Sequence, residues 1–215
     1  MADLKAIEPF AADFSRPADA VAADLESYAT LLRKWQGVQN LVSRETLNTL
    51  WTRHFADSLQ ATAFLSESDH EVLDFGSGGG FPALPMAIAS KGTKRHFTLI
   101  EPTARKVSFL RTVARELDLS VTVVGRRSDQ IDSRETAVPD VLTSRALAAL
   151  PQLFAWMDPF FGEKSRAILH KGREHVDEIR ESSAQWDYDV LIHPSSTDPG
   201  GVILEITNLR GKSKR

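Results

Sequence analysis

Apolar residues recur at helical spacing through the first seventy residues of the chain. One set repeats every three or four positions, at Val21, Leu25, Tyr28, Leu31, Leu32 and Trp35. A second set runs from about Thr46 through Trp51 and Phe55 to Phe64. Such a period is typical of helices that bury one face. The pattern predicts that residues 1–70 form an N-terminal helical extension.

From Glu71 onward the pattern changes to short apolar runs. Seven runs fit β-strands: EVLDF, HFTLIE, VTVVG, DVLTSRA, RAILHKG, YDVLIH and GVILEITNL. Strands that alternate with helices indicate a mostly parallel, doubly wound α/β sheet. The last two runs are joined by the short segment PSSTDPG, so they should pair as an antiparallel hairpin at the edge of the sheet. We assign residues 71–215 to this domain.

The composition excludes several classes of protein. The chain has 215 residues, of which 42% are apolar, which suits one domain with an elaboration or two small domains. It contains no cysteine, which excludes disulfides, thiolate metal ligands and a cysteine nucleophile. No stretch approaches the roughly 18 continuous apolar residues of a membrane span, and the N-terminal segment lacks a signal-peptide pattern. We expect a cytoplasmic protein without a membrane partner or a bound metal.

Charge is distributed unevenly along the chain. The formal net charge is −3, which disfavours a strongly basic nucleic-acid binder. Residues 1–30 carry six acids against two bases, whereas the last six residues, RGKSKR, carry four bases and no acid. Local basic patches are therefore compatible with the acidic total.

The sequence VLDFGSGGGFP, residues 72–82, places a glycine-rich turn directly after the first strand. In an open α/β sheet the ligand binds beyond the carboxyl ends of the strands, so this turn is the expected place for a ligand. Gly76, Gly78 and Gly80 would let the backbone approach that ligand without interference from Cβ atoms. A tight turn with a structural role alone is the alternative.

The residues around this turn indicate which ligand it binds. A dinucleotide fingerprint that begins at Gly76 needs glycine at position 81, which is Phe81, and no Gly-Lys-Ser/Thr follows for a phosphate loop. Asp74 precedes the glycines, and Glu101 ends the second strand, where a carboxylate can accept hydrogen bonds from ribose hydroxyls. Carboxylates repel phosphate and favour an ammonium group. The turn therefore favours S-adenosyl-L-methionine, which has a ribose and an ammonium group but no phosphate.

Several longer segments resemble one known family. They are NLVSRETLNTLWTRHFADSL, VLDFGSGGGFPALPMAIA, LIEPTARKVSFLRTVA, TSRALAAL and LHKG, and together they run over most of the chain. They resemble the glucose-inhibited division protein B family, also called ribosomal small-subunit methyltransferase G. The combination of Arg-His-x-x-Asp-Ser, Gly-Phe-Pro and Ser-Arg-Ala is more specific than the glycine turn alone. Ala83, Pro102 and the dipeptide Val-Ser after Leu41 depart from the family pattern.

The resemblance implies a fold and an activity. Family members are bacterial enzymes with a Rossmann-like class I methyltransferase fold, in which a seven-stranded, mostly parallel sheet has an antiparallel last strand. They transfer a methyl group from S-adenosyl-L-methionine to N7 of one guanine in the 530 loop of 16S ribosomal RNA. The expected partner is therefore 16S ribosomal RNA or the small ribosomal subunit, and the expected state of the protein is a monomer.

The resemblance also implies cofactor contacts. It places them at Gly76 and Phe81 in the loop, at Arg127 and Ser128 after the third strand, and at Arg145 at the end of the fourth. With the acids and glycines discussed above, the expected cofactor-binding residues are Asp74, Gly76, Gly78, Gly80, Phe81, Glu101, Arg127, Ser128 and Arg145.

The methyl acceptor decides which groups the site needs. Carbon 5 of a pyrimidine requires a covalent cysteine, which the chain lacks. Exocyclic amines typically require an Asn- or Asp-Pro-Pro-aromatic turn after the fourth strand, where this chain reads TSRALAALP. Guanine N7 has a free lone pair and releases no proton, so its methylation needs no general base. This agrees with the sequence, because His54, His170, Asp57 and Ser58 fit packing or capping roles at least as well as catalytic ones.

Arg145 and Lys171 are the candidate catalytic residues. Arg145 ends a strand on the ligand side and could order the pocket or donate to guanine O6. The alternative for Arg145 is a salt bridge to Asp74 or Glu101. Lys171 ends the fifth strand and could reach O6 or a phosphate, and its alternative is a solvated surface lysine.

RNA contacts are expected from basic residues. The candidates are Arg126, Lys171 and Arg173, together with the C-terminal Arg210, Lys212, Lys214 and Arg215. Each could instead be a solvating surface charge. Two other functions fit the same pocket, namely methylation of a small molecule under a helical lid and noncatalytic binding of cofactor or RNA.

Overall fold

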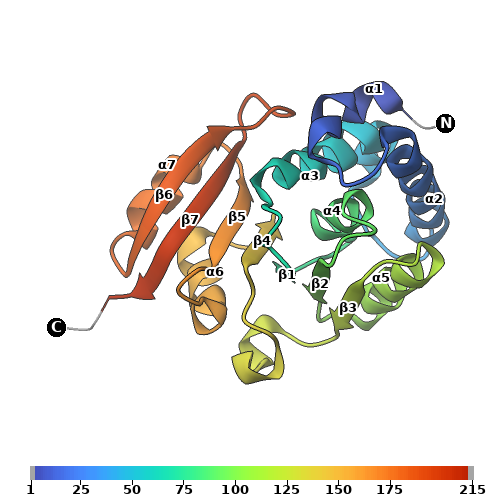
Figure 1. Cartoon of the computed structure of the whole chain (residues 1–215). Helices are drawn as coiled ribbons and strands as arrows, with labels where there is room; N and C mark the ends of the chain where they lie inside the picture. Colours follow the sequence, from blue (N-terminus) through green and yellow to red (C-terminus); the bar gives the residue numbers. More distant parts are fainter. Residues whose placement is uncertain (1–2, 213–215) are drawn as a thin grey trace.

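A single seven-stranded mixed sheet organises the computed structural model, which describes residues 3–212 (Figure 1). The strand order is β3-β2-β1-β4-β5-β7-β6. The first five strands pair in parallel, whereas β7 runs antiparallel to both β5 and β6. The bounds of the strands are β1 Glu71–Phe75, β2 His96–Ile100, β3 Val121–Val124, β4 Val141–Arg145, β5 Arg166–Lys171, β6 Trp186–Pro194 and β7 Val202–Gly211.

This topology confirms the expected strands and the hairpin at the sheet edge. The hairpin β6–β7 places its second strand, β7, between β5 and the edge strand β6. Strand order reverses between β1 and β4, because the chain moves outward from β1 to β3 and then returns to the other side of β1. Such a reversal opens a crevice at the carboxyl ends of the strands.

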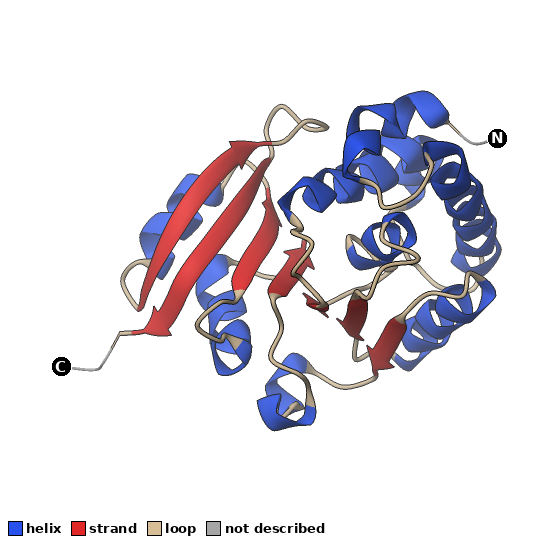
Figure 2. Cartoon of the chain, viewed as in Figure 1, coloured by secondary structure: helices blue, strands red, loops and turns tan. Residues whose placement is uncertain are grey.

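Helices cover both faces of the sheet (Figure 2). One apolar cluster joins the N-terminal helices, α4 and α5 to one face, and a second joins α6 to the other face with α7 at its margin. The bounds of the helices are α1 Leu4–Ile7, η1 Glu8–Asp13, α2 Ala18–Gln36, η2 Arg44–Thr49, η3 Trp51–Ala56, α3 Asp57–Leu59, η4 Gln60–Phe64, α4 Ala83–Ala89, α5 Ala104–Glu116, η5 Ser128–Gln130, η6 Ser133–Glu135, α6 Leu150–Met157, η7 Asp158–Phe160 and α7 His175–Ser182. The division between residues 1–70 and 71–215 stays a prediction.

The second helical pattern of the sequence is not one regular α-helix. It consists of a 3-10 segment η2, a π-helical segment η3, a single α-turn α3 and a further 3-10 segment η4. The periodicity predicted helix correctly but could not resolve these changes of pitch. π-Helical turns often occur at functional sites, and η3 carries His54, which faces the pocket described below.

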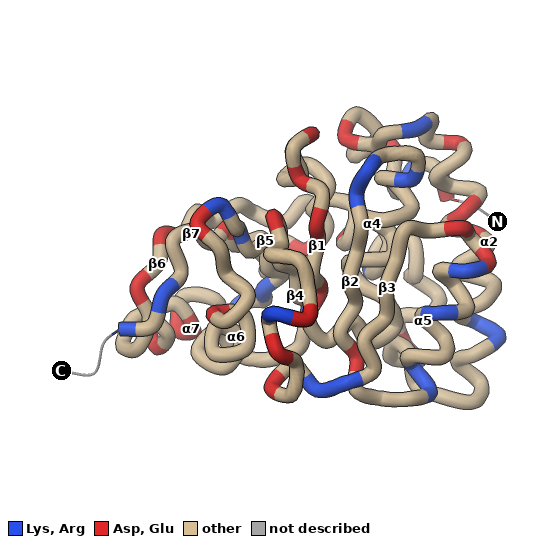
Figure 3. Tube along the Cα trace, turned by 60° about the horizontal axis from the view of Figure 1, so that its bottom comes forward, with Lys and Arg blue, Asp and Glu red and all other residues tan. Residues whose placement is uncertain are grey.

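Charged residues of both signs are interspersed over the surface (Figure 3). Cations follow α5, while the β6–β7 hairpin carries mainly acids (Figure 3). None of the described helices has the length and apolar character that a membrane crossing requires.

Tyr28 joins the middle of α2 to the glycine-rich loop. Its side chain is fully buried, and its hydroxyl donates a hydrogen bond to the carbonyl oxygen of Gly79. The ring lies 5.4 Å from Phe55 and 5.6 Å from Phe81, measured between centroids. Burial is the main cause that raises the pKa of Tyr28 well above its ordinary value, so the hydroxyl stays protonated and donates. The N-terminal helices therefore fix the position of the loop.

We predict that Tyr28→Phe lowers the free energy of unfolding by about 1–3 kcal/mol, because the buried carbonyl of Gly79 loses its donor. The same change should weaken binding of S-adenosyl-L-methionine several-fold, since the loop is less firmly held. Urea denaturation and titration calorimetry measure the two effects.

Tyr188→Phe is the matched control. The Tyr188 hydroxyl donates to the Ile179 carbonyl over 3.1 Å in the C-terminal part of the chain, away from the loop. This variant should lose stability but keep its cofactor affinity. If both variants bind the cofactor as the unmodified protein does, the hydroxyl of Tyr28 does not position the loop.

Candidate active site

A hollow of about 420 Å³ lies at the carboxyl ends of β1, β2 and β4, and we call it the glycine-loop pocket. Four segments that are distant in sequence form its walls. They are Leu41, Val42 and His54; Gly76, Ser77, Gly78, Gly79 and Phe81; Glu101, Pro102, Thr103 and Lys106; and Arg145, Ala146 and Leu147. The pocket is therefore where the strand reversal and the glycine-rich turn were expected to place a ligand.

Gly76 shows why the turn needs glycine. Its φ is +68°, in the left-handed region that L side chains rarely adopt. A Cβ atom at this position would lie 2.4 Å from Cδ1 of Leu147, on the opposite wall of the pocket. A side chain here would therefore both strain the backbone and fill the narrow part of the pocket.

Glu101 presents a fixed carboxylate to the pocket. The residue follows β2 and is 4% exposed. Its Oε2 accepts a hydrogen bond from the backbone N–H of Gly78 over 2.9 Å, and its Oε1 accepts one from Thr103 N–H over 2.9 Å. A carboxylate has about four lone-pair sites, so both oxygens retain capacity for ligand hydroxyls. This donor set suits the two adjacent hydroxyls of a ribose.

Asp74 lies beneath the loop and does not line the pocket. It is fully buried, and its Oδ1 accepts a hydrogen bond from the Thr143 hydroxyl over 2.8 Å. Its Oδ2 has no hydrogen-bond partner among the described residues. Burial raises the pKa of Asp74 to about 7, more than its hydrogen bonds lower it. Near neutral pH this carboxyl is therefore populated in both protonation states.

Arg145 ends β4 and connects the sheet to the N-terminal segment. Its Nη1 donates to Asp57 Oδ2 over 3.0 Å and to the Arg53 carbonyl over 3.2 Å. Its guanidinium carbon lies 5.0 Å from the centroid of the Phe81 ring. Arg145 therefore forms a salt bridge, but with Asp57 and not with Asp74 or Glu101 as the alternative expected. The reason is that the side chain turns from the strand toward α3.

His54 is neutral and engaged at both ring nitrogens. Nδ1 lies 2.8 Å from Arg145 Nη2, and because arginine has no acceptor, Nδ1 must accept. Nε2 then carries the hydrogen and donates to the Thr46 hydroxyl over 2.8 Å. Burial, followed by the nearby charge of Arg145, lowers the pKa of His54 to about 4. His54 therefore packs and positions Arg145, as the packing alternative anticipated.

His170 and Ser58 also occupy packing positions. His170 is buried, and its Nε2 lies 2.8 Å from the carbonyl oxygen of Asp57, so this nitrogen carries the hydrogen and donates. Burial is the main cause that lowers the pKa of His170, which keeps the ring neutral. Ser58 donates to the His54 carbonyl over 2.7 Å.

Lys171 is neither solvated nor directed at the glycine-loop pocket. Its side chain is 8% exposed. The ammonium group donates to the Ala148 carbonyl and to Glu178 Oε2, each over 2.7 Å. The alternative of a surface lysine is therefore wrong, because successive residues of a strand point to opposite faces and Lys171 points toward α6 and α7.

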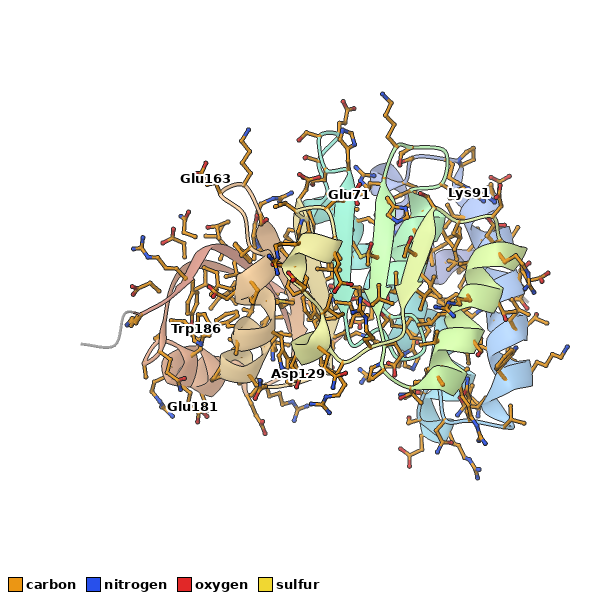
Figure 4. The ribbon with its side chains drawn as sticks, turned by 90° about the horizontal axis from the view of Figure 1, so that it is seen from below. Glu71, Lys91, Asp129, Glu163, Glu181 and Trp186 are labelled. Carbon is orange, nitrogen blue, oxygen red and sulfur yellow. The ribbon has the colours of Figure 1, made fainter. Side chains whose placement is uncertain are left out.

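The residues after β3 lie outside the walls of the pocket. Arg126 and Arg127 are exposed and paired with Glu135 and Asp129, respectively. Ser128 begins the short segment η5. Glu71, the first residue of β1, and Asp129 lie at opposite ends of the strands (Figure 4). Asp129 is therefore at the end where the parallel strands finish. The segment therefore lies where the strands end but outside the walls of the pocket.

The other candidate RNA-binding cations also have local contacts. Arg173 is exposed and lies against Gly200 at the tip of the β6–β7 hairpin. Arg210 and Lys212 lie 3.9 Å and 3.6 Å from the carboxylate of Asp187. The remaining two candidates, Lys214 and Arg215, lie outside the described residues.

Several wall residues were not anticipated from the sequence. Lys106 could have been found, because it lies in the first turn of the helix that follows Glu101. Leu41, Val42 and Leu147 carried no local signal, since they reach the pocket only through the packing of distant segments.

Comparison with known proteins identifies the family. The sequence model of the family described as rRNA small subunit methyltransferase G (GidB) matches residues 21–199. The chain belongs to the rRNA small subunit methyltransferase G family. Proteins named ribosomal RNA small subunit methyltransferase G are similar to it in Bartonella henselae, with 42% identity over 87% of this chain and 86% of the relative, and in Brucella anthropi, with 41% identity over 87% and 88%.

Solved structures support the fold. A cofactor-bound protein from MTB is similar with a TM-score of 0.59 at 12% identity, over 86% of this chain and 89% of the other. The ribosomal protein L11 methylase of Lactobacillus delbrueckii subsp. bulgaricus is similar with a TM-score of 0.53 at 13% identity, over 72% and 78%. As an rRNA small subunit methyltransferase G family member, the chain thus has the expected Rossmann-like class I methyltransferase fold.

We predict that Gly76→Val abolishes binding of S-adenosyl-L-methionine while the sheet stays folded. The added side chain would meet Leu147 and close the narrow part of the pocket. Calorimetry should show at least a hundredfold loss of affinity, and circular dichroism should show an unchanged helix and strand content.

Gly92→Val is the matched control for backbone strain. Gly92 has a φ of +92° with no heavy atom within 4 Å of a built Cβ. Both variants should lose roughly 1–2 kcal/mol of stability from the left-handed conformation. Only Gly76→Val should lose the cofactor, and normal affinity in that variant would mean that the cofactor binds elsewhere.

We predict that Asp74→Asn changes how stability depends on pH. The pKa of Asp74 is about 7 when folded, above the value of 3.8 for a solvated carboxyl, so the folded state holds the proton more tightly. Stability contributed by this carboxyl is present at low pH and lost as the pH rises toward 7.

Asparagine does not titrate, so the unmodified protein should lose stability relative to Asp74→Asn as the pH increases. The difference should grow by roughly 1 kcal/mol for each pH unit between 5 and 7 and then level off. Urea denaturation of both proteins at a series of pH values measures it. A constant difference over this range would contradict the raised pKa.

Proposed function

We propose that this protein transfers a methyl group from S-adenosyl-L-methionine to N7 of a guanine in the 530 loop of 16S ribosomal RNA. Membership of the rRNA small subunit methyltransferase G family makes it an rRNA methyltransferase. The choice of N7 is supported by one observation, which is that the described pocket residues include no free general base. Bound S-adenosyl-L-methionine supplies an activated methyl group on a sulfonium.

The residues of the glycine-loop pocket fit this cofactor. The Glu101 carboxylate is held by two backbone N–H groups and suits ribose hydroxyls. Leu41, Val42 and Leu147 provide apolar wall for the adenine and the methylene groups. Lys106 and Arg145 provide positive charge for the methionine carboxylate. We assign Asp74 a supporting role beneath the loop and no direct contact with the cofactor, because it is buried and does not line the pocket.

The titratable groups that line the pocket are engaged in other contacts or carry a positive charge. His54 accepts from Arg145 at one nitrogen and donates from the other. Both oxygens of Glu101 are held by backbone N–H groups, while Lys106 and Arg145 are cations. Methylation of an amine must release a proton, whereas methylation of guanine N7 does not. A site of this kind therefore suits N7.

Arg145 is the proposed catalytic residue. Three of its contacts fix the guanidinium, and a guanidinium has five N–H donors, so donors remain for guanine O6. We assign Lys171 a positioning role, since it holds the Ala148 carbonyl in the loop that follows Arg145. Alignment of the acceptor with the methyl group can lower the barrier by roughly 7–11 kcal/mol.

The remaining expectations belong to the same proposal. We infer that the protein acts as a monomer in the cytoplasm and needs no membrane. Arg126 and Arg173 are exposed and can exchange their local contacts for RNA phosphates. We infer that Arg127 and Ser128, which follow β3, contribute to the adenine end of the cofactor site.

The proposal predicts a methyl group on N7 of one guanine. Purified protein is incubated with radiolabelled S-adenosyl-L-methionine and with 16S ribosomal RNA or small subunits from a strain that lacks the enzyme. Borohydride and aniline then cleave RNA at N7-methylguanine, and primer extension locates the cut. One cut in the 530 loop is expected.

Arg145→Lys is the control variant, because lysine keeps the charge but cannot make the contacts to Arg53, His54 and Asp57 together. It should bind the cofactor but methylate at least tenfold less RNA, which is seen as a tenfold weaker cut after borohydride and aniline treatment. Label that enters only small molecules would favour the small-molecule alternative. Cofactor binding without labelled RNA would favour the noncatalytic one.

A further inference from the structure

A second hollow, of about 180 Å³, lies on the other side of Arg145, and we call it the hairpin pocket. Its walls come from the carboxyl ends of β4 and β5, from α3 and from the loop of the β6–β7 hairpin. Arg145 and Ala146 line both pockets, so the two hollows meet at these residues. Ala146 has a φ of +53°, a strained conformation for a non-glycine residue that is common at functional sites.

The hairpin wall is held in place by polar contacts. Asp198 Oδ1 accepts from the Gly200 N–H over 3.0 Å, and its Oδ2 lies 3.2 Å from Arg53 Nη1. The Thr197 hydroxyl donates to Asp57 Oδ1 over 2.8 Å. Since Asp57 also binds Arg145, the hairpin loop and the guanidinium are fixed relative to each other.

The hairpin pocket is polarised. Arg145 supplies hydrogen-bond donors on the side that it shares with the glycine-loop pocket. The opposite wall supplies the Asp198 carboxylate and the buried ring of His170, while the ammonium group of Lys171, which also lines the pocket, donates to Ala148 and Glu178. His170 Nε2 donates to the Asp57 carbonyl, which leaves Nδ1 as an acceptor without a partner among the described residues. An unpaired buried acceptor destabilises the protein, and here it adds to the acceptor character of this wall.

Guanine has the complementary polarity. Its N7 and O6 acceptors lie on one edge, and the N1–H and N2 amine donors lie on another. When N7 faces the glycine-loop pocket, O6 lies beside N7 and meets Arg145, while the donors face the opposite wall. Adenine would place its N6 amine against the donors of Arg145 and its N1 acceptor against a carboxylate. The pocket would therefore reject adenine.

We propose that the hairpin pocket holds the target guanine and that Asp198 determines its specificity by accepting hydrogen bonds from the N1–H and N2 amine. This inference rests on the proposed function and extends it, because family membership does not assign the residues that recognise the base. Asp198 keeps lone pairs for this purpose, since its side chain is 39% exposed and a carboxylate can accept several hydrogen bonds. Removal of the target base from its stack would bring it here.

Replacement of the target guanine by inosine tests the inference, because inosine has N7, O6 and N1–H but lacks the N2 amine. The unmodified protein should methylate the guanine RNA with a kcat/KM roughly 10- to 100-fold above that of the inosine RNA, the range expected for a hydrogen bond to a charged group. Asp198→Asn should lower kcat/KM for guanine by a similar factor and lose most of the discrimination. Asparagine retains an oxygen for the Gly200 N–H and loses only the exposed contact to Arg53, which contributes little to stability, so the hairpin turn is preserved.

Asp187→Asn is the matched control. Asp187 is an exposed acid on the same hairpin, paired with Lys212 at the end far from the pocket. The Asp187→Asn variant should leave kcat/KM unchanged for both the guanine RNA and the inosine RNA. Calorimetry should give all three proteins the same affinity for S-adenosyl-L-methionine, which separates the hairpin pocket from the cofactor site.

The outcomes distinguish this inference from the proposed function. Absence of methyl transfer to guanine RNA by the unmodified protein would overturn the function itself. Normal transfer with undiminished discrimination in Asp198→Asn would overturn the role of Asp198 alone. Equal rates for guanine and inosine RNA in the unmodified protein would also overturn the role of Asp198. This comparison needs no variant, so it tests that role even if Asp198→Asn loses affinity for the cofactor.

Discussion

The guanidinium of Arg145 is the interaction on which the arrangement of the site depends. It lies at the end of β4, is 18% exposed, and binds the Arg53 carbonyl, His54 and Asp57 from the N-terminal segment. Arginine stays charged in proteins, so at this depth it requires acceptors, and three from one segment fix both the charge and the segment. Because Arg145 and Ala146 separate the glycine-loop pocket from the hairpin pocket, this one cation sets the boundary between them.

The N-terminal helices are consequently part of the site. Leu41, Val42 and His54 form a wall of the glycine-loop pocket, and Tyr28 binds the carbonyl of Gly79 in the loop. The changes of helical pitch between η2 and η4 have a physical reason in this role. A regular helix presents a continuous stripe to the sheet, whereas the π-helical turn η3 carries the ring of His54 to the guanidinium. A separate lid would not need contacts of this kind.

Local patterns in the sequence were enough to predict the strands and the place of the pocket. The alternation of apolar runs identified the strands and the edge hairpin, and the spacing of Gly76 and Glu101 located the glycine-loop pocket. The sequence did not predict which groups meet across the pocket. Asp57 as the partner of Arg145, the burial of Lys171 and the position of Asp198 follow from packing between segments far apart in the chain. No local period or motif encodes such contacts, because they depend on how completed elements pack.

A net charge of −3 is consistent with an RNA-modifying enzyme that places only two of its 26 lysines and arginines, Lys106 and Arg145, among the described residues on the walls of the glycine-loop pocket. Arg126 and Arg127 are paired with acids, so sequence-independent attraction to phosphates is limited. Lys106 and Arg145, in contrast, line the pocket, where surrounding apolar groups strengthen their interactions. Weak attraction to phosphates makes recognition depend on the shape of the RNA and on contacts within the pocket. An enzyme of this charge therefore gains selectivity for a structured rRNA site over the excess of other RNA.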